Sequence, residues 1–159
     1  IFSESIQKNI EFGNPNATID QVKQAGVLSE IDSEILKFEK GYETILGERG
    51  VTLSGGQVQR LSIARSFIKD SEIYLFDDCF SSLDSDTEER IINNLKNNFK
   101  NKTLLIVSHR VSCVKHADNI IVLDNGKIIQ QGTHKELTNN EGFYSELYKK
   151  QNSEKNNHI

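Results

Sequence analysis

The chain has 159 residues, the size of one domain, and a formal net charge of −4 at pH 7. This acidic balance argues against the basic surface of nucleic-acid-binding proteins, so neither DNA nor RNA is an expected partner. No apolar run approaches the roughly 18 residues of a membrane span, and two cysteines, Cys79 and Cys113, are too few for a disulfide framework or a zinc site and are expected to be reduced thiols.

The chain contains no methionine and begins at Ile1, so we interpret it as a fragment or a processed product. Its sequence suggests three parts. We expect a helical subdomain over residues 1–70, the C-terminal part of an α/β core over residues 71–150, and a polar tail over residues 151–159 that frays.

Apolar residues at helical spacing predict the helices of the first part. Thr18 and Gln21 match a capping box. It precedes one stripe, Ile19, Val22 and Ala25, and a second segment carries Ile31, Ile35, Leu36 and Phe38. After a glycine-punctuated loop from Gly41 to Gly56, a helix is expected from Gln57, with Val58, Leu61, Ala64 and Ile68 on one stripe.

The middle of the chain predicts a strand, a helix and a second strand. Residues 73–76 form an apolar run that ends in Asp77 and Asp78, and residues 103–107 form the next run; both are expected to be buried strands. Between them Ser85 and Glu88 match a capping box, ahead of the apolar stripe Ile91, Ile92, Leu95 and Phe99. This order predicts two parallel strands joined by a right-handed crossover helix.

The last part predicts a hairpin followed by a helical region. Asn125 and Gly126 form the strongest short turn signal for a hairpin, between residues 120–123 and 127–130. Thr133 and Glu136 match a third capping box. The region that follows holds Leu137, Phe143, Leu147 and Tyr148.

Polar residues follow both predicted parallel strands. Asp77 and Asp78 end the first strand, and Ser108 and His109 end the second. Ligands of open parallel sheets bind at the carboxyl ends of strands, so these groups are expected to face one crevice, with Asp77 as a metal candidate. A helix-capping loop accounts for the two aspartates equally well, and a hydrogen-bonded histidine at a strand end accounts for His109.

The turn from Leu53 to Gln57 could hold a phosphate. Gly55 and Gly56 let the backbone approach a ligand, Ser54 offers a hydroxyl, and the following helix points its free N–H groups outward. An ordinary Ser-Gly-Gly turn with a helix cap is the alternative.

Taken together, four motifs resemble those of ATP-binding cassette (ABC) ATPases. Residues 53–60, LSGGQVQR, are similar to the family's signature motif, and residues 73–78, IYLFDD, to its Walker B strand. Residues 81–84, SSLD, resemble the D-loop, and His109 stands where the switch histidine would be. The resemblance implies an α/β P-loop NTPase fold, RecA-like, with a parallel sheet, a helical signature subdomain and its N-terminal portion missing.

The resemblance also implies a role for each motif residue. Asp77 would hold Mg²⁺ through water, and His109 would contact the γ-phosphate of ATP. Ser54, Gly55, Gly56 and Gln57 would bind the γ-phosphate of a nucleotide held by a second nucleotide-binding domain, since family members bind two ATP molecules between two domains placed head to tail. Asp84 would lie at the dimer interface.

Two departures from the family pattern matter. The pattern GxxxxGK[ST] of the phosphate-binding loop occurs nowhere in the 159 residues, so we expect the isolated chain to bind ATP weakly or not at all. Asp78 stands where the family usually has a catalytic glutamate, one methylene longer. That replacement resembles the degenerate-site subunit of heterodimeric exporters, so a heterodimer is the favoured assembly.

The loop over residues 41–50, GYETILGERG, is similar to one found in exporters, where it touches the coupling helices of the membrane domain. A solvated surface loop is the alternative. The resemblance therefore implies an exporter motor at the cytoplasmic face of a membrane, with the membrane domain upstream. Two other functions compete with the exporter motor. One is a soluble cassette ATPase, and the other is a non-catalytic remnant that only completes a partner's site.

Overall fold

The computed structural model describes residues 1–47 and 50–156, so Glu48 and Arg49 of the predicted exporter loop lie outside the described residues. The chain divides into two compact units, Ile1–Leu105 and Ile106–Ile159. In the described part of the chain, none of the helices has both the length and the apolar character that crossing a membrane requires.

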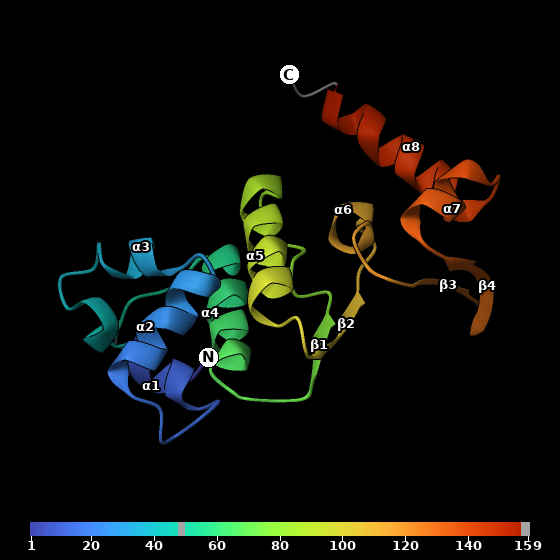
Figure 1. Ribbon diagram of the computed structural model, residues 1–159. Coiled ribbons are helices and arrows are strands. Elements are labelled where there is room, and N and C mark those ends of the chain that lie inside the picture. The colour runs from blue at the N-terminus through green and yellow to red at the C-terminus, as the bar shows by residue number, and fades with distance from the viewer. Residues whose placement is uncertain (48–49, 157–159) are drawn as a thin grey trace. The chain divides into compact units, whose positions relative to one another are not determined.

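The first unit is mainly helical (Figure 1). Its elements are α1 (Ile6–Glu11), α2 (Ile19–Leu28), α3 (Asp32–Ile35), the 3-10 helix η1 (Gly41–Glu43), α4 (Gly55–Phe67), β1 (Ile73–Asp77) and α5 (Ser85–Asn98). The predicted capping box of Thr18 and Gln21 is confirmed at the start of α2. The second predicted segment is shorter than expected: α3 is a single turn, and Leu36 after it is 62% exposed.

Two predicted helix starts are wrong by one or two residues. The signature helix α4 begins at Gly55 rather than Gln57, because Ser54 caps it and the glycines form its first turn. Helix α5 is capped by Asp84 rather than by Ser85, since the Asp84 carboxylate accepts a hydrogen bond from Thr87 N. A carboxylate at this position also interacts favourably with the positive end of the helix dipole.

The core of the first unit lies between α1, α2, α4 and α5. Several of its buried side chains come from the predicted stripes, namely Val22, Leu61, Ala64, Ile91 and Leu95, and Ile10 of α1 adds one that the sequence analysis did not predict. An aromatic cluster joins the end of α4 to β1 and to the end of α5: Phe67, Tyr74, Phe76, Phe80 and Phe99. This packing fixes the position of the chain on both sides of Asp77.

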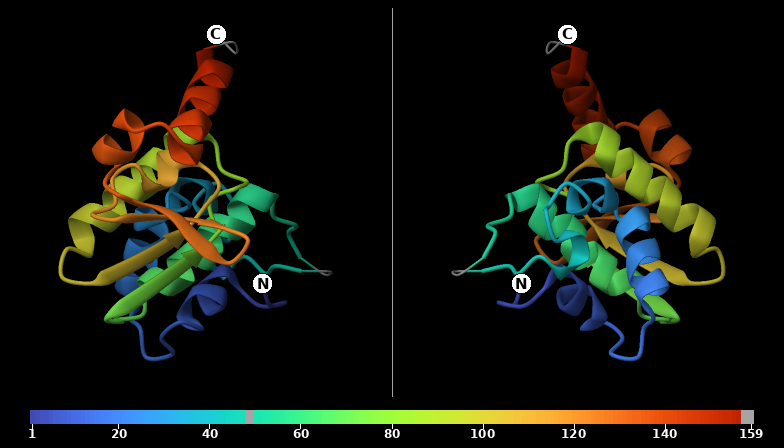
Figure 2. Two further views of the ribbon diagram at one scale, coloured as in Figure 1. Left: turned by 90° about the vertical axis from the view of Figure 1, so that its right-hand side faces the viewer. Right: turned by 90° about the vertical axis from the view of Figure 1, so that its left-hand side faces the viewer.

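β1 pairs with β2 (Thr103–Val107) in a two-stranded sheet, and both strands point in the same direction (Figure 2). The predicted parallel pair with its crossover helix is therefore confirmed. The expectation that both strands are buried is wrong: Tyr74 and Phe76 face the core, but Ile73, Leu75 and Leu105 are 67%, 63% and 55% exposed. Among the described residues of this unit, no layer covers that second face of the sheet.

The second unit contains α6 (Val111–Val114), the strands β3 (Ile120–Asp124) and β4 (Lys127–Gly132), and the helices α7 (His134–Asn139) and α8 (Phe143–Asn156). β3 and β4 form the predicted antiparallel hairpin, and Asn125 and Gly126 have the positive φ angles that its turn requires. The Thr133–Glu136 capping box is confirmed on α7. Helix α8 extends through residues 151–156, which the composition predicted to fray.

Candidate functional site

The Ser-Gly-Gly turn is shaped by the capping box at the start of α4. Ser54 Oγ accepts a hydrogen bond from Gln57 N at 3.3 Å, and Gln57 Oε1 accepts one from Ser54 N at 2.8 Å. Across the described residues, the N–H groups of Gly55 and Gly56 have no acceptor. These two N–H groups and the Ser54 hydroxyl hydrogen can therefore donate to an anion at the positive end of the helix dipole.

The two glycines of the turn differ in how far the fold accounts for them. A Cβ atom at Gly56 would lie 3.1 Å from the carbonyl oxygen of Ser82, a tight contact with backbone. At Gly55 the nearest atoms would be those of the Ser82 side chain, at 3.6 and 3.7 Å, which is ordinary contact distance. Glycine also costs more conformational entropy in a helix than alanine does. The fold therefore explains the glycine at position 56 but not the one at position 55.

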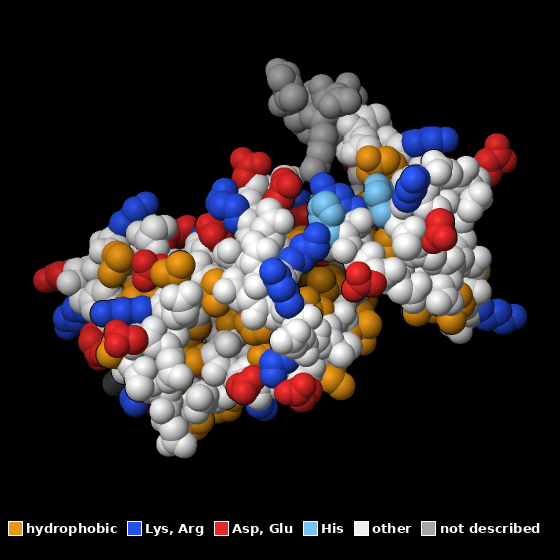
Figure 3. Space-filling model, in the orientation of Figure 1, with side chains coloured by type: hydrophobic (Ala, Val, Ile, Leu, Met, Phe, Trp, Pro, Cys, Tyr) orange, Lys and Arg blue, Asp and Glu red, His pale blue; other side chains and the backbone are white. Residues whose placement is uncertain are grey.

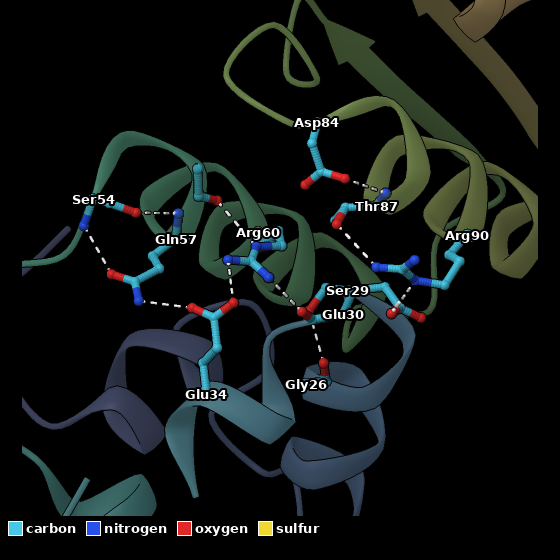
Figure 4. A network of polar contacts seen from close by, with 11 residues as sticks. Gly26, Ser29, Glu30, Glu34, Ser54, Gln57, Arg60, Asp84, Thr87 and Arg90 are labelled. Atoms are coloured by element: carbon cyan, nitrogen blue, oxygen red, sulfur yellow. Dashed lines mark hydrogen bonds and ion pairs between the residues drawn. The ribbon is translucent and has the colours of Figure 1, made fainter. Parts of the chain in front are cut away.

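A polar network fixes the turn to the helical segment before it (Figure 4). Gln57 Nε2 donates to Glu34 Oε2 at 2.7 Å, and the Arg60 guanidinium forms an ion pair with Glu34 at 2.7 Å. Arg60 Nη1 also donates to the carbonyl oxygen of Glu30 at 2.7 Å. Burial alone would raise the pKa of Glu34, but the hydrogen bonds from Gln57 and Arg60, with the charge of Arg60, hold that pKa below its usual value.

A second set of hydrogen bonds joins α4 to the D-loop-like segment Ser81–Asp84. Gln59 Nε2 donates to Ser81 Oγ at 3.0 Å, and Gln59 Oε1 accepts from Ser82 N at 2.8 Å. Ser81 Oγ in turn donates to the carbonyl oxygen of Asp78 at 3.1 Å. The signature-like turn and the end of β1 are thus brought together in the first unit.

The acidic residues after β1 have different surroundings. Asp77 is the last residue of β1 and is exposed, as is Asp78. Asp78 has a φ of +48°, in the left-handed region that aspartate tolerates better than most residues. Asp84 is used as the cap of α5, and the hydrogen bonds from Thr87 keep the pKa of its carboxyl below the usual value.

The donor set suits a magnesium ion that arrives with a nucleotide. Mg²⁺ prefers oxygen ligands and is usually held by one or two carboxylates together with phosphate oxygens and water. Asp77 offers such a carboxylate at the carboxyl end of its strand. Over the described ranges there is no group of three or more His, Cys, Asp or Glu residues arranged to hold a metal. Cys79 and Cys113 are not joined by a disulfide.

The remaining predicted site residue, His109, lies in the second unit, after the end of β2. Its side chain is exposed, and its carbonyl oxygen accepts a hydrogen bond from Gln151 Nε2 at 2.8 Å. Ser108 Oγ accepts from Arg110 N at 3.0 Å. The backbone at His109 is therefore fixed by a residue of α8, 42 positions along the chain.

Sequence reasoning missed the residues that support these motifs: Glu34, Gln59, Arg60 and Gln151. Gln59 and Arg60 belong to the signature-like stretch, but nothing in their spacing indicates which segment they contact. Charged and amide residues are common on helix surfaces, and Gln59 and Arg60 reach Ser81 and Glu30, which lie 22 and 30 residues away. Their roles become visible only when the fold brings these segments together.

Acidic and basic side chains are interspersed over the helices of the first unit on the face drawn in Figure 3. The donors identified at the turn are backbone N–H groups and a hydroxyl. Such a site is suited to a phosphate group that is held mainly by other residues.

Comparison with known proteins gives the same assignment as the motifs. The family model described as "ABC transporter" matches residues 4–81. The chain is 44% identical over 95% of its length to the probable multidrug resistance ABC transporter ATP-binding/permease protein YheI of Bacillus subtilis (strain 168). It is 46% identical over 97% of its length to ABC transporter B family member 4 of Dictyostelium discoideum. It spans 26% and 20% of these two relatives.

The fold agrees with a solved structure of the same family. A bacterial Atm1-family ABC exporter with ATP bound superposes with a TM-score of 0.89 at 36% identity, over 95% of this chain and 27% of that one. The expected α/β P-loop NTPase fold is thereby confirmed. With its motifs, its fold and its relatives in agreement, the chain belongs to the ABC transporter family and forms part of an ATP-binding domain.

Proposed function

We propose that this chain is the C-terminal part of the nucleotide-binding domain of an ABC exporter, in which ATP binding and hydrolysis between two such domains drive transport across a membrane. Its relatives are named as ATP-binding/permease and export proteins. The chain covers about a quarter of their length. The membrane domain and the phosphate-binding loop would be supplied by the rest of such a protein, and the chain would act at the cytoplasmic face.

The glycine at position 55 is the observation that best supports this function. Neither packing nor backbone angle requires a glycine there, and a side chain would fit within the chain itself. An external group that approaches the backbone closely does require one. The Gly55 and Gly56 N–H groups and the Ser54 hydroxyl are the donors that a γ-phosphate needs, and Gln57 would hold the turn that presents them.

The residues at the carboxyl ends of the two parallel strands would bind and hydrolyse the chain's own ATP. Asp77 would hold Mg²⁺ through water, and the ion would neutralise charge on the phosphates. His109 would contact the γ-phosphate and help to place the attacking water, and Asp78 would polarise that water. Phosphoryl transfer depends mainly on positioning and charge stabilisation, so these residue types fit the reaction.

We further propose a heterodimer in which this chain carries the weaker site. Asp78 is one methylene shorter than glutamate, and a displacement of about 1 Å can cost roughly a hundredfold in rate. The signature-like turn, by contrast, is complete and well supported. Asp84 would lie at the seam between the domains, where its cap on α5 keeps the D-loop in place.

The uncovered face of β1 and β2 is consistent with a larger nucleotide-binding core. Continuous apolar strands are typical of parallel sheets that are covered on both faces. Ile73, Leu75 and Leu105 would then pack against the part of the core that carries the phosphate-binding loop. The 159-residue chain alone is expected to bind ATP weakly.

The test is a Gly55→Asp substitution in the full-length transporter, with Gly126→Asp as the control. Both place a carboxylate on an exposed glycine, and Gly126 lies in the hairpin turn with no atom near a built Cβ and a φ that aspartate tolerates. We expect Gly55→Asp to abolish ATP-driven hydrolysis and transport, and Gly126→Asp to leave both unchanged. Normal turnover by a folded Gly55→Asp transporter would refute the proposal.

A further inference from the structure

Gln151 on α8 holds the backbone that follows β2. Its Nε2 donates to the carbonyl oxygen of His109 at 2.8 Å, and its Oε1 accepts from Val111 N at 2.9 Å. Both partners lie in the second unit, as Gln151 does, so the contact is internal to that unit.

The sequence of α8 explains why Gln151 reaches this position. Tyr144, Leu147 and Tyr148 pack into the core of the second unit, together with Val111 of α6 and Leu137 of α7. Position 151 follows Leu147 by one helical turn and so continues the same face. The apolar stripe therefore ends in a glutamine at the point where it meets the segment from His109 to Val111.

The amide of Gln151 acts on this segment as a neighbouring strand would. In a parallel ladder, one residue of the neighbouring strand bonds to the C=O before and the N–H after the residue opposite to it. Here the side-chain amide supplies one donor and one acceptor to residues two positions apart, and Arg110 between them is extended, with φ −97° and ψ 119°. The peptide planes on both sides of Arg110 are fixed in this way.

We propose that Gln151 is a positioning residue for His109, fixing the backbone from which the imidazole projects toward the γ-phosphate. The inference rests on the proposed role of His109 and extends the site to α8. A misplacement of about 1 Å can cost roughly a hundredfold in rate. If the His109 backbone is no longer held, the imidazole is less precisely placed, and we expect the rate of hydrolysis to fall rather than the affinity for ATP.

Glutamine is the side chain that can make both contacts. Glutamate keeps the size and the acceptor for Val111 N, but it has no donor for the His109 carbonyl. Leucine has a similar volume and can make neither hydrogen bond. The two replacements therefore separate the donor function from the rest of the side chain.

The experiment measures steady-state ATP hydrolysis by the full-length transporter in an Asp78→Glu background, chosen so that this chain's own site contributes to turnover. The variants are Gln151→Glu and Gln151→Leu, the control is the exposed neighbour Asn152→Ala, and the reference is His109→Ala. We expect both Gln151 variants to lower kcat about tenfold with KM for ATP within about twofold, and Asn152→Ala to change neither. His109→Ala is expected to lower kcat further.

Each outcome bears on a different claim. If His109→Ala lowers kcat and both Gln151 variants keep it, the positioning role is wrong and the proposed function stands. If His109→Ala also leaves kcat unchanged, the role of His109 itself fails. If the Gln151 variants lower the melting temperature and raise KM as well as lowering kcat, Gln151 only stabilises the unit, and the inference is overturned. Should Gln151→Leu fail to fold, Gln151→Glu provides the same test with less disturbance.

Discussion

The side chain of Gln59 on α4 holds the backbone of Ser82, with 2.8 Å between Gln59 Oε1 and Ser82 N. Its other amide atom binds Ser81 Oγ, which binds the carbonyl oxygen of Asp78. In the proposed dimer, the turn before α4 serves the partner's ATP while Asp78 serves the chain's own. Gln59 therefore connects residues of two different ATP sites.

Replacing Gln59 by leucine should uncouple these segments without unfolding the protein. The two hydrogen bonds are exposed and together contribute on the order of 1–2 kcal/mol, a few degrees of melting temperature at most. We expect ATP turnover of the full transporter to fall about tenfold, since both sites depend on the linked backbone. Gln24→Leu, at an exposed glutamine of α2, is the matched control. Unchanged turnover in Gln59→Leu would contradict this role.

Asp78→Glu should raise ATP turnover. The additional methylene brings the carboxylate to the length that the family usually has at this position, on a backbone that is already in the left-handed region. Hydrolysis by the full transporter is the measurement, and Asp118→Glu, at an exposed aspartate of the second unit, controls for the change of residue type. A rate equal to that of the natural sequence would argue against the degenerate-site assignment.

Glu34 should make the stability of the first unit depend on pH. Its pKa in the folded chain lies below the usual value, so the charged form is favoured by folding. The stabilisation is complete above the usual glutamate pKa of about 4.3 and is lost as the pH falls through the lowered value. Scanning calorimetry should therefore show that Glu34→Gln costs more stability at about pH 6 than at about pH 3. Glu39→Gln, at an exposed glutamate, is the control for the change of residue type. An equal cost at both pH values would contradict the network around Glu34.

Local signals in the sequence predicted most of the fold correctly. The capping boxes at Thr18 and Thr133 and the Asn125–Gly126 turn are short-range patterns whose partners lie within four residues, so the sequence contains all that they need. The start of α5 was misplaced because Asp84-x-x-Thr87 and Ser85-x-x-Glu88 overlap, and the pattern alone does not rank them. The exposure of Ile73 and Leu75 was missed because an apolar run does not reveal whether both faces are covered.

The site was predictable only in part, for a related reason. Motif residues such as Ser54, Gly55 and Asp77 could be picked out because their types and order match the phosphate chemistry. Supporting residues could not, since Glu34 and Gln151 contact their partners across 23 and 42 positions of the chain. Such contacts depend on tertiary packing, which periodicity and composition do not determine.

The most direct test of the account asks which nucleotide the turn at Ser54 and Gly55 serves. The full transporter is assembled with two distinguishable polypeptides, Gly55→Asp is placed only in this one, and a photoactivatable ATP analogue is crosslinked after closure. We expect the label retained on the partner polypeptide to decrease more than the label on this chain, because the altered turn would face the partner's nucleotide. A loss confined to this chain's own label, or no loss at all, would contradict it.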